Sequence, residues 1–201
     1  MKLFLVRHGQ SVGNLHADED MPDSPLTSTG EMQAEKVASY LCRKSVTRII
    51  SSPLIRAIQT AKPLSDQISV PVEVWTELYE YREGPAFHSL PRKEIQKAVP
   101  GIILPGEILE TGWRCQGEEN IDAVCKRAKS IVQKIRCCPD DDVALFAHGM
   151  LIEFLIREIL HLPHMINVHF FQENTGINCF QLEGNRVKVL SLNQTEHLRC
   201  S

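Results

Sequence analysis

The sequence predicts an α/β fold of three layers, with a mainly parallel central sheet flanked by helices and extended by a C-terminal antiparallel hairpin. Short apolar runs alternate with longer segments of helical periodicity through most of the chain, as in strand–helix–strand units. Two later strand-like runs, 177–182 and 187–192, flank Gly184-Asn185, a pattern that favours a hairpin. The length of 201 residues, without an internal repeat or an interdomain linker, indicates one domain over 1–201.

The composition narrows the class of protein. Hydrophobic residues make up 43% of the chain and charged residues 23%, which is ordinary for a globular protein. These values exclude chain-wide disorder and a collagen-like or coiled-coil chain. The formal net charge is −3, whereas a dedicated nucleic-acid-binding protein usually carries a basic excess. We therefore expect no nucleic-acid partner.

Several features bear on the cellular location. No apolar run approaches the roughly 20 residues that a membrane-spanning helix needs. The apolar run 3–6 is followed at once by Arg7 and His8, so it is too short for the core of a signal peptide. Seven cysteines, an odd number scattered without a Cys-x-x-Cys pair, favour a reducing compartment. We expect a cytoplasmic protein with no membrane partner, and no pattern indicates its oligomeric state.

The N-terminal part predicts a strand, a loop and a helix. Residues 2–6 are rich in aliphatic and aromatic side chains, as in a short buried strand. Residues 9–25 are polar and contain glycines and prolines, which favours a long loop. Ser28 and Glu31 fit the Ser/Thr-x-x-Glu capping box, so we expect a helix from Ser28 to about Cys42. Its buried face is expected to comprise Met32, Val37, Tyr40 and Leu41.

Two short strands on either side of a helix come next. Residues 48–51 and 70–75 have the apolar, β-branched character of strands. Pro53 suits the start of a helix, where its missing N–H is not needed, and the helix is expected to extend to about Ile68. Pro63 lies inside this helix, where a proline predicts a kink or an early end.

The second half of the chain predicts an irregular insertion followed by helix, strand and helix. Residues 76–117 hold five of the eleven glycines and four of the eleven prolines, which favours an irregular insertion with one short helix at 92–98. Residues 143–147 predict a buried strand, and 150–160 predict a helix. The segment 120–136 predicts a helix with a buried face of Ile121, Val124, Ala128, Ile131 and Ile135.

Chemically capable side chains follow the predicted strands. Arg7 and His8 follow the first strand, Arg56 follows the second, and His148 follows the fourth. The segment after the third strand carries three carboxylates, Glu77, Glu80 and Glu83. Because ligands of open α/β sheets bind beyond the carboxyl ends of the strands, we expect these side chains to converge at one edge of the sheet.

Two histidines, two arginines and a carboxylate suit the transfer of a phosphoryl group. The arginine fork matches phosphate oxygens, and a neutral imidazole is a competent nucleophile near neutral pH. A carboxyl group with a raised pKa can protonate the leaving oxygen and then serve as base for water. Such a site needs neither a metal ion nor an organic cofactor, and we expect none.

Five segments carry a resemblance to a known family, and they occur in the family's order. They are LVRHGQS at 5–11, PLTSTGEMQA at 25–34, SSPLIRAIQTA at 51–61, LYE at 78–80 and AHG at 147–149. Together they resemble the motifs of the histidine phosphatase superfamily, the phosphoglycerate mutase-like family. Asn14 and Asn174 also fit this pattern.

The resemblance implies a role for each matched residue. His8 would be the nucleophile that becomes phosphohistidine, and Glu80 would be the proton donor, with Glu83 as the alternative donor. The phosphoryl oxygens would be bound by Arg7, Arg56 and His148. Secondary phosphate contacts would come from Ser11 and Asn14, although these two side chains equally suit a purely local role in stabilising the loop.

The expected function is hydrolysis of phosphate monoesters of small organic molecules through a phosphohistidine intermediate. One alternative is a cofactor-dependent phosphoglycerate mutase, and another is a non-catalytic module that binds a phosphate ligand. The short chain favours a phosphatase over a mutase. The segment after Glu80 lacks the Gly-x-Trp-Glu-Gly pattern of many phosphatase members, so the sequence leaves the substrate open.

Overall fold

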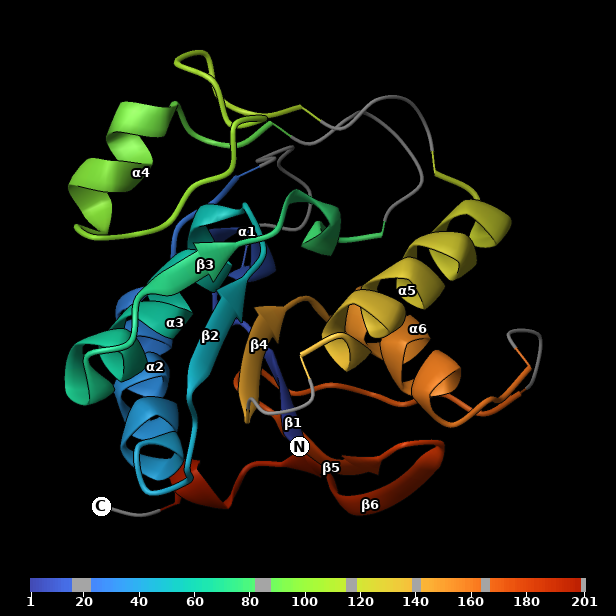
Figure 1. Cartoon of the computed structure of the whole chain (residues 1–201). Helices are drawn as coiled ribbons and strands as arrows, with labels where there is room; N and C mark the ends of the chain where they lie inside the picture. Colours follow the sequence, from blue (N-terminus) through green and yellow to red (C-terminus); the bar gives the residue numbers. More distant parts are fainter. Residues whose placement is uncertain (16–22, 82–87, 115–118, 139–141, 164–166, 200–201) are drawn as a thin grey trace.

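Two layers of helices flank a central sheet, as the ribbon shows (Figure 1). The structure is a computed structural model, and it describes residues 1–15, 23–81, 88–114, 119–138, 142–163 and 167–199. Its helices are α1 (Val12–Leu15), α2 (Ser28–Leu41), α3 (Ile55–Ile68), α4 (Arg92–Ala98), α5 (Ile121–Arg136) and α6 (Gly149–Ile159), with short 3-10 turns η1 (Thr76–Leu78) and η2 (Glu196–Leu198). Its strands are β1 (Lys2–Arg7), β2 (Arg48–Ser51), β3 (Val72–Val74), β4 (Val143–Ala147), β5 (Ile177–Glu183) and β6 (Arg186–Gln194).

The sheet has the order β3-β2-β4-β1-β5-β6. The first four strands in this order are parallel, whereas β5 runs antiparallel to β1 and β6 runs antiparallel to β5. The predicted α/β class, with a mainly parallel sheet and a C-terminal antiparallel hairpin, is therefore confirmed. Because β4 lies between β2 and β1, the segments that follow these three strands emerge beside one another.

Strand β1 illustrates how the sequence builds two cores. Successive side chains of a strand point to opposite faces of the sheet. Leu3 and Leu5 accordingly pack in the cluster formed with α5 and α6, and Phe4 and Val6 pack in the cluster formed with α2 and α3. All four side chains are buried, so β1 is covered on both faces, as is usual for strands of parallel sheets.

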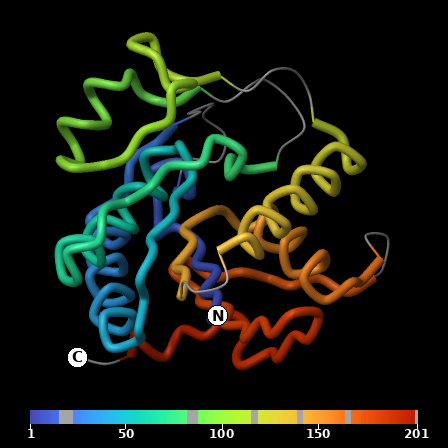
Figure 2. The backbone as a smooth tube through the Cα atoms, in the orientation of Figure 1, coloured from blue at the N-terminus to red at the C-terminus, as the bar shows by residue number. Residues whose placement is uncertain are grey.

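The segment 88–114 lies beyond the carboxyl ends of the parallel strands and carries α4 (Figures 1 and 2). Its buried side chains Ile95, Val99 and Ile102 belong to the same cluster as those of α2 and α3. This part of the predicted insertion is therefore fixed to the core on that side of the sheet.

The structure differs from the sequence expectations at several points. A short helix, α1, occurs inside the segment that was expected to be a loop. The N-cap of α2 is Thr27, one residue before the expected Ser28, and its hydroxyl accepts a hydrogen bond from the Gly30 nitrogen. Helix α3 continues through Pro63 to Ile68, so the expected early end does not occur.

Two side chains expected in the core are exposed. Met32 is 60% exposed and Ile121 is 40% exposed. The buried face of α2 consists largely of small residues, Gly30, Ala34 and Ala38, together with Val37 and Leu41. A Cβ atom on Gly30 would lie 2.0 Å from the Gln10 carbonyl oxygen, so α2 approaches the loop after β1 through its glycine.

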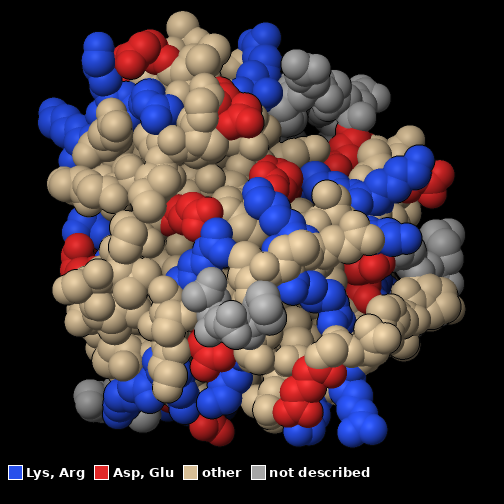
Figure 3. Space-filling view, viewed as in Figure 1, with Lys and Arg blue, Asp and Glu red and all other residues tan. Residues whose placement is uncertain are grey.

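Within the described residues, no helix has the length and apolar character that crossing a bilayer requires. Charged side chains of both signs are interspersed over the described part of the face in Figure 3, without a continuous basic surface.

Candidate active site

The two central strands β1 and β4 each deliver a histidine. Arg7 pairs with Ala147 in the parallel register, and the backbone nitrogen of His8 donates to the Ala147 carbonyl at 2.9 Å. His148 follows Ala147 directly, so the His8 and His148 rings lie edge to face with centroids 5.2 Å apart. The convergence therefore follows from strand pairing between segments far apart in the chain.

His8 is buried, and its two ring nitrogens have different neighbours. Nδ1 lies 2.7 Å from the Gly9 carbonyl oxygen, which can only accept, so Nδ1 carries the proton and Nε2 keeps its lone pair. The Arg56 Nε donates to this Nε2 at 3.3 Å. Burial, with Arg56 and Arg7 nearby, holds the pKa of His8 well below its usual range. The ring is therefore neutral near pH 7, which is the form that acts as a nucleophile.

Two arginines supply positive charge at the same edge. Arg56 lies in the first turn of α3 and is buried. Arg7 donates from Nη1 to the Gln172 carbonyl at 2.7 Å, whereas its buried Nε has no hydrogen-bond partner within the described residues. Burial lowers the pKa of Arg7 and the nearby Glu80 raises it, but a guanidinium remains charged at any ordinary pH. A buried cation with an unused donor suits an anionic ligand.

His148 is held by a hydroxyl group. Its Nε2 lies 2.7 Å from the Ser52 Oγ, which also accepts a hydrogen bond from the Leu54 nitrogen. Its buried Nδ1 has no hydrogen-bond partner in the part of the chain that the structure describes. Burial, with Arg56 and the other histidine nearby, holds the pKa of His148 well below its usual range. Nδ1 is therefore a second polar atom that is available to a ligand.

Glu80 lies at the N-terminus of α6, two residues beyond η1. Its carboxylate accepts hydrogen bonds from the backbone nitrogens of Leu151 at 3.0 Å, Met150 at 3.3 Å and Tyr81 at 2.9 Å. Burial raises the pKa of Glu80, and these amides and Arg56 partly oppose that shift. A carboxyl group with a raised pKa beside two arginines is suited to exchanging a proton with a bound anion. The alternative donor, Glu83, lies outside the described residues.

The sequence also matches a known protein family. The sequence profile of the histidine phosphatase superfamily (branch 1) matches residues 3–195. The chain belongs to the histidine phosphatase superfamily. The resemblance inferred from the five motifs is thereby confirmed.

The chain is also similar to individual proteins. It is 30% identical over 171 residues to a glucosyl-3-phosphoglycerate phosphatase of Mycolicibacterium vanbaalenii, covering 81% of this chain and 75% of that one. It is also 30% identical over 171 residues to a protein of Yersinia enterocolitica named probable phosphoglycerate mutase, covering 81% and 76%. The solved structure of a mycobacterial glucosyl-3-phosphoglycerate phosphatase complexed with VO3 is 25% identical, covers 96% of this chain and 99% of its own, and superposes with a TM-score of 0.70. Relatives named phosphatases support a phosphatase.

Ser11 directly precedes α1 and Asn14 lies within it, and their observed contacts are with other residues of the chain. The Asn14 Oδ1 accepts from the Ser11 nitrogen at 3.0 Å and from the Asn174 Nδ2 at 3.3 Å. Asn174 also donates to the His8 carbonyl at 3.1 Å. The Asn14 amide therefore joins the segment after His8 to the segment before β5. Ser11 is buried.

Three residues of the site received no role from sequence reasoning. Ser52 contacts His148, Gln172 contacts Arg7, and Asp23 accepts from the nitrogen of Ile55, which precedes Arg56. Ser52 follows a predicted strand, which is a usable signal. Gln172 contributes a backbone carbonyl from a segment without periodicity, so no signal in its side chain could have identified it.

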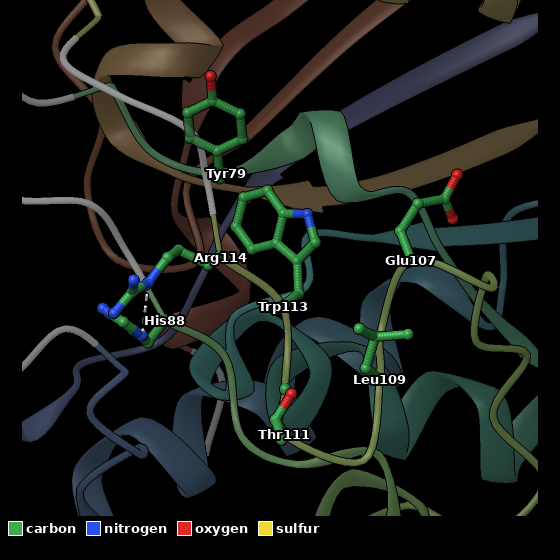
Figure 4. A pocket seen from close by; sticks show the side chains of 8 residues that line it. Tyr79, His88, Glu107, Leu109, Thr111, Trp113 and Arg114 are labelled. Atoms are coloured by element: carbon green, nitrogen blue, oxygen red, sulfur yellow. Dashed lines mark hydrogen bonds between the residues drawn. The ribbon is translucent and has the colours of Figure 1, made fainter.

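A hollow of about 810 Å³ lies beside the insertion, next to the segment that carries Glu80. It is lined by Tyr79, His88, Glu107, Leu109, Thr111, Gly112, Trp113 and Arg114. Figure 4 shows Trp113 at the centre of this lining, and the Arg114 Nε donates to the His88 Nδ1 at 3.3 Å. Aromatic walls with a few polar groups are typical of sites for organic ligands.

No set of three His, Cys, Asp or Glu side chains within the described ranges is arranged to hold a metal ion. The polar atoms that converge at the strand ends are mostly N–H donors, which match the oxygens of an anion. The arrangement can therefore bind a phosphoryl group, and the His8 Nε2 lone pair becomes available to it once the Arg56 Nε–H turns from that nitrogen to a phosphoryl oxygen.

Proposed function

We propose that the protein hydrolyses phosphate monoesters of small organic molecules through a phosphohistidine intermediate. The observation that carries this proposal is the state of His8. Its Nδ1–H is tied to the Gly9 carbonyl and its Nε2 lone pair faces Arg56. Arg7 and His148 add buried donors that have no protein partner within the described residues.

In the first step, the His8 Nε2 attacks phosphorus and the bond from phosphorus to the ester oxygen breaks. Arg7, Arg56 and His148 stabilise the charge on the phosphoryl oxygens. Glu80 in its protonated form, which burial favours by raising its pKa, gives its proton to the departing alkoxide. The products of this step are an alcohol, a phosphorylated His8 and an ionised Glu80.

In the second step, water attacks the phosphohistidine. Ionised Glu80 takes a proton from this water as the bond between phosphorus and Nε2 breaks. Inorganic phosphate leaves, and both His8 and Glu80 return to their starting states. The same carboxyl group therefore serves as acid and then as base.

A second candidate function is a phosphoglycerate mutase, in which the phosphohistidine returns its phosphoryl group to a hydroxyl of the bound acid. The similarity to the protein named probable phosphoglycerate mutase supports it. The two functions differ in product, because a mutase yields the isomer and a phosphatase yields inorganic phosphate.

The test is phosphate release from 4-nitrophenyl phosphate, 3-phosphoglycerate, phosphoserine, a sugar phosphate and a nucleotide, without added metal. The unaltered protein and His8→Ala are compared side by side, with the fold of each checked by circular dichroism. We expect release that is lost in His8→Ala. Equal activity in both proteins would overturn the nucleophile assignment, and conversion of 3-phosphoglycerate into its isomer without net phosphate release would favour the mutase.

A further inference from the structure

Arg127 of α5 makes an unusually complete set of contacts just behind Glu80. Its Nε and Nη2 bind the two carboxylate oxygens of Glu119, with the Nε bond at 2.7 Å. Its Nη1 donates to the carbonyl oxygens of Glu77 and Tyr79, both at 2.8 Å. The guanidinium carbon also lies 3.8 Å from the centre of the Tyr79 ring. The Arg127 guanidinium thus uses all three of its nitrogens and one face of its plane.

The environment of this contact set is largely buried. The side chains of Arg127 and Glu119 are 10% and 9% exposed. A buried ion pair is costly to desolvate and contributes little stability compared with an apolar pair of the same size, so stability alone gives a weak account of it. What the pair does provide is a fixed fork of donors, because Glu119 holds the guanidinium in one orientation.

The carbonyl groups of Glu77 and Tyr79, which the third nitrogen of Arg127 binds, belong to the segment that leads directly into Glu80. Beyond η1, residues 79–81 belong to no helix or strand, and Tyr79 is in an extended conformation. Glu80 itself is bound on its other side by the nitrogens of Met150 and Leu151 at the start of α6. Arg127 therefore fixes the backbone before Glu80, and α6 fixes its carboxylate.

We propose that Arg127 is a positioning residue that holds Glu80 where it can protonate the leaving group. The inference rests on the proposed phosphatase function. Arg127 is not a catalytic residue, because its contacts are with Glu119, Glu77 and Tyr79 and not with the convergent donors around His8. The charge of Arg127 also lowers the pKa of His148. Removing Arg127 together with its partner Glu119 leaves the net charge there unchanged, so the loss of the pair should act on the reaction mainly through Glu80.

The test uses the difference between good and poor leaving groups. General acid catalysis matters most when the departing alkoxide is a strong base, and it contributes about 10²–10⁴-fold. Removing Arg127 alone would strand the buried Glu119 charge, so the main variant is Glu119→Gln/Arg127→Met. The control is Arg136→Met, an arginine of the same helix whose Nη1 donates to the Gly184 carbonyl on the hairpin. Arg127→Lys keeps the charge without the fork.

We expect Glu119→Gln/Arg127→Met to lower kcat/KM for alkyl phosphates by 10-fold or more and for 4-nitrophenyl phosphate by less than 3-fold. Arg127→Lys should show the same split, and Arg136→Met should show none. In a protein that already carries Glu80→Gln, the double change should cause no further loss, because Arg127 then has no proton transfer left to support. An equal loss for all substrates, or losses that multiply with Glu80→Gln, would overturn the inference.

A second measurement does not depend on turnover. The carboxyl carbon of Glu80, followed by NMR against pH, should titrate nearer to an ordinary glutamate in Glu119→Gln/Arg127→Met than in the unaltered protein, because a released side chain reaches water. An unchanged titration would also overturn the inference. If the unaltered protein released no phosphate from any compound, the proposed function would fail, and this titration would still decide whether Arg127 holds Glu80.

Discussion

The Thr60 hydroxyl oxygen lies 3.0 Å from the backbone nitrogen of Gly9 and accepts its hydrogen bond. The same hydroxyl donates to the Arg56 carbonyl at 2.6 Å, one turn earlier in α3. Thr60 therefore connects the loop that carries His8 to the helix that carries Arg56. His8 and Arg56 are thus joined through one buried side chain as well as by their direct hydrogen bond.

Thr60→Val should weaken both the fold and the proposed reaction. Valine fills the same space but leaves the buried Gly9 N–H without a partner, which costs about 1–3 kcal/mol of the free energy of unfolding. Urea unfolding measures that loss, and kcat/KM measures the accompanying drop in activity. Thr60→Ser keeps the hydroxyl and should retain most of the activity, and a serine variant as slow as the valine variant would contradict the assigned role.

Ser52→Ala should slow turnover without unfolding the protein. The change removes the hydroxyl that lies 2.7 Å from the His148 Nε2, so the ring loses its fixed orientation. A lost hydrogen bond of about 1.4 kcal/mol corresponds to a tenfold decrease in kcat/KM. Ser51→Ala is the matched control, because Ser51 is also buried at the end of β2 but donates only to the Ser52 carbonyl. Similar losses in both variants would indicate a general packing effect.

Glu80→Gln should lower the rate for alkyl phosphates by about 10²–10⁴-fold and affect activated aryl phosphates much less. When transfer of the phosphoryl group to His8 limits the rate, the active form of the protein is the one in which Glu80 is protonated. The rate of the unaltered protein with a poor leaving group should then fall as pH rises through the raised pKa of Glu80, and the glutamine variant should lack that decline. Equal losses with alkyl and aryl esters would disprove the acid assignment.

Asp23 should make the folded protein more stable as the pH falls, which is the opposite of what a carboxylate with a lowered pKa does. Burial raises its pKa to about 6, although its carboxylate accepts bonds from Ile55 at 2.6 Å and Leu90 at 3.0 Å. Because the folded pKa lies above the unfolded value of 3.8, the folded state holds the proton more tightly between these two values. The free energy of unfolding should therefore rise, relative to Asp23→Asn, as pH falls from 7 to 4. Urea unfolding at several pH values measures this difference, and a constant difference would rule out the titration.

Much of the fold was predictable because local patterns and the final packing agree. Residues 48–51, 92–98 and 143–147 form elements with the predicted bounds. Met32 shows where the pattern misled, since hydrophobicity alone marks it as a core residue. The close approach of α2 to the Gln10 carbonyl selects the face that bears Gly30 and leaves Met32 in solvent.

The placement of the site was predictable to the same degree, since it depends on strand ends. Arg7, His8 and His148 lie together because β1 and β4 pair in parallel, which an alternating pattern of strands and helices favours. The supporting contacts were not predictable. Gln172 reaches Arg7 across 165 residues through a backbone carbonyl, and such a contact leaves no periodic pattern in the sequence.

The central position of β4 also constrains how the protein can be made. During synthesis β1 has no parallel neighbour until residues about 140 positions later emerge, because β4 separates it from β2. Contacts between residues so far apart in the sequence form slowly, and the apolar strand β1 remains without its parallel neighbour until they form. A nascent chain that ends before β4 can therefore hold His8 without forming the site around it. Any activity that depends on His8 and His148 together therefore requires synthesis to have passed β4 and β4 to have paired with β1.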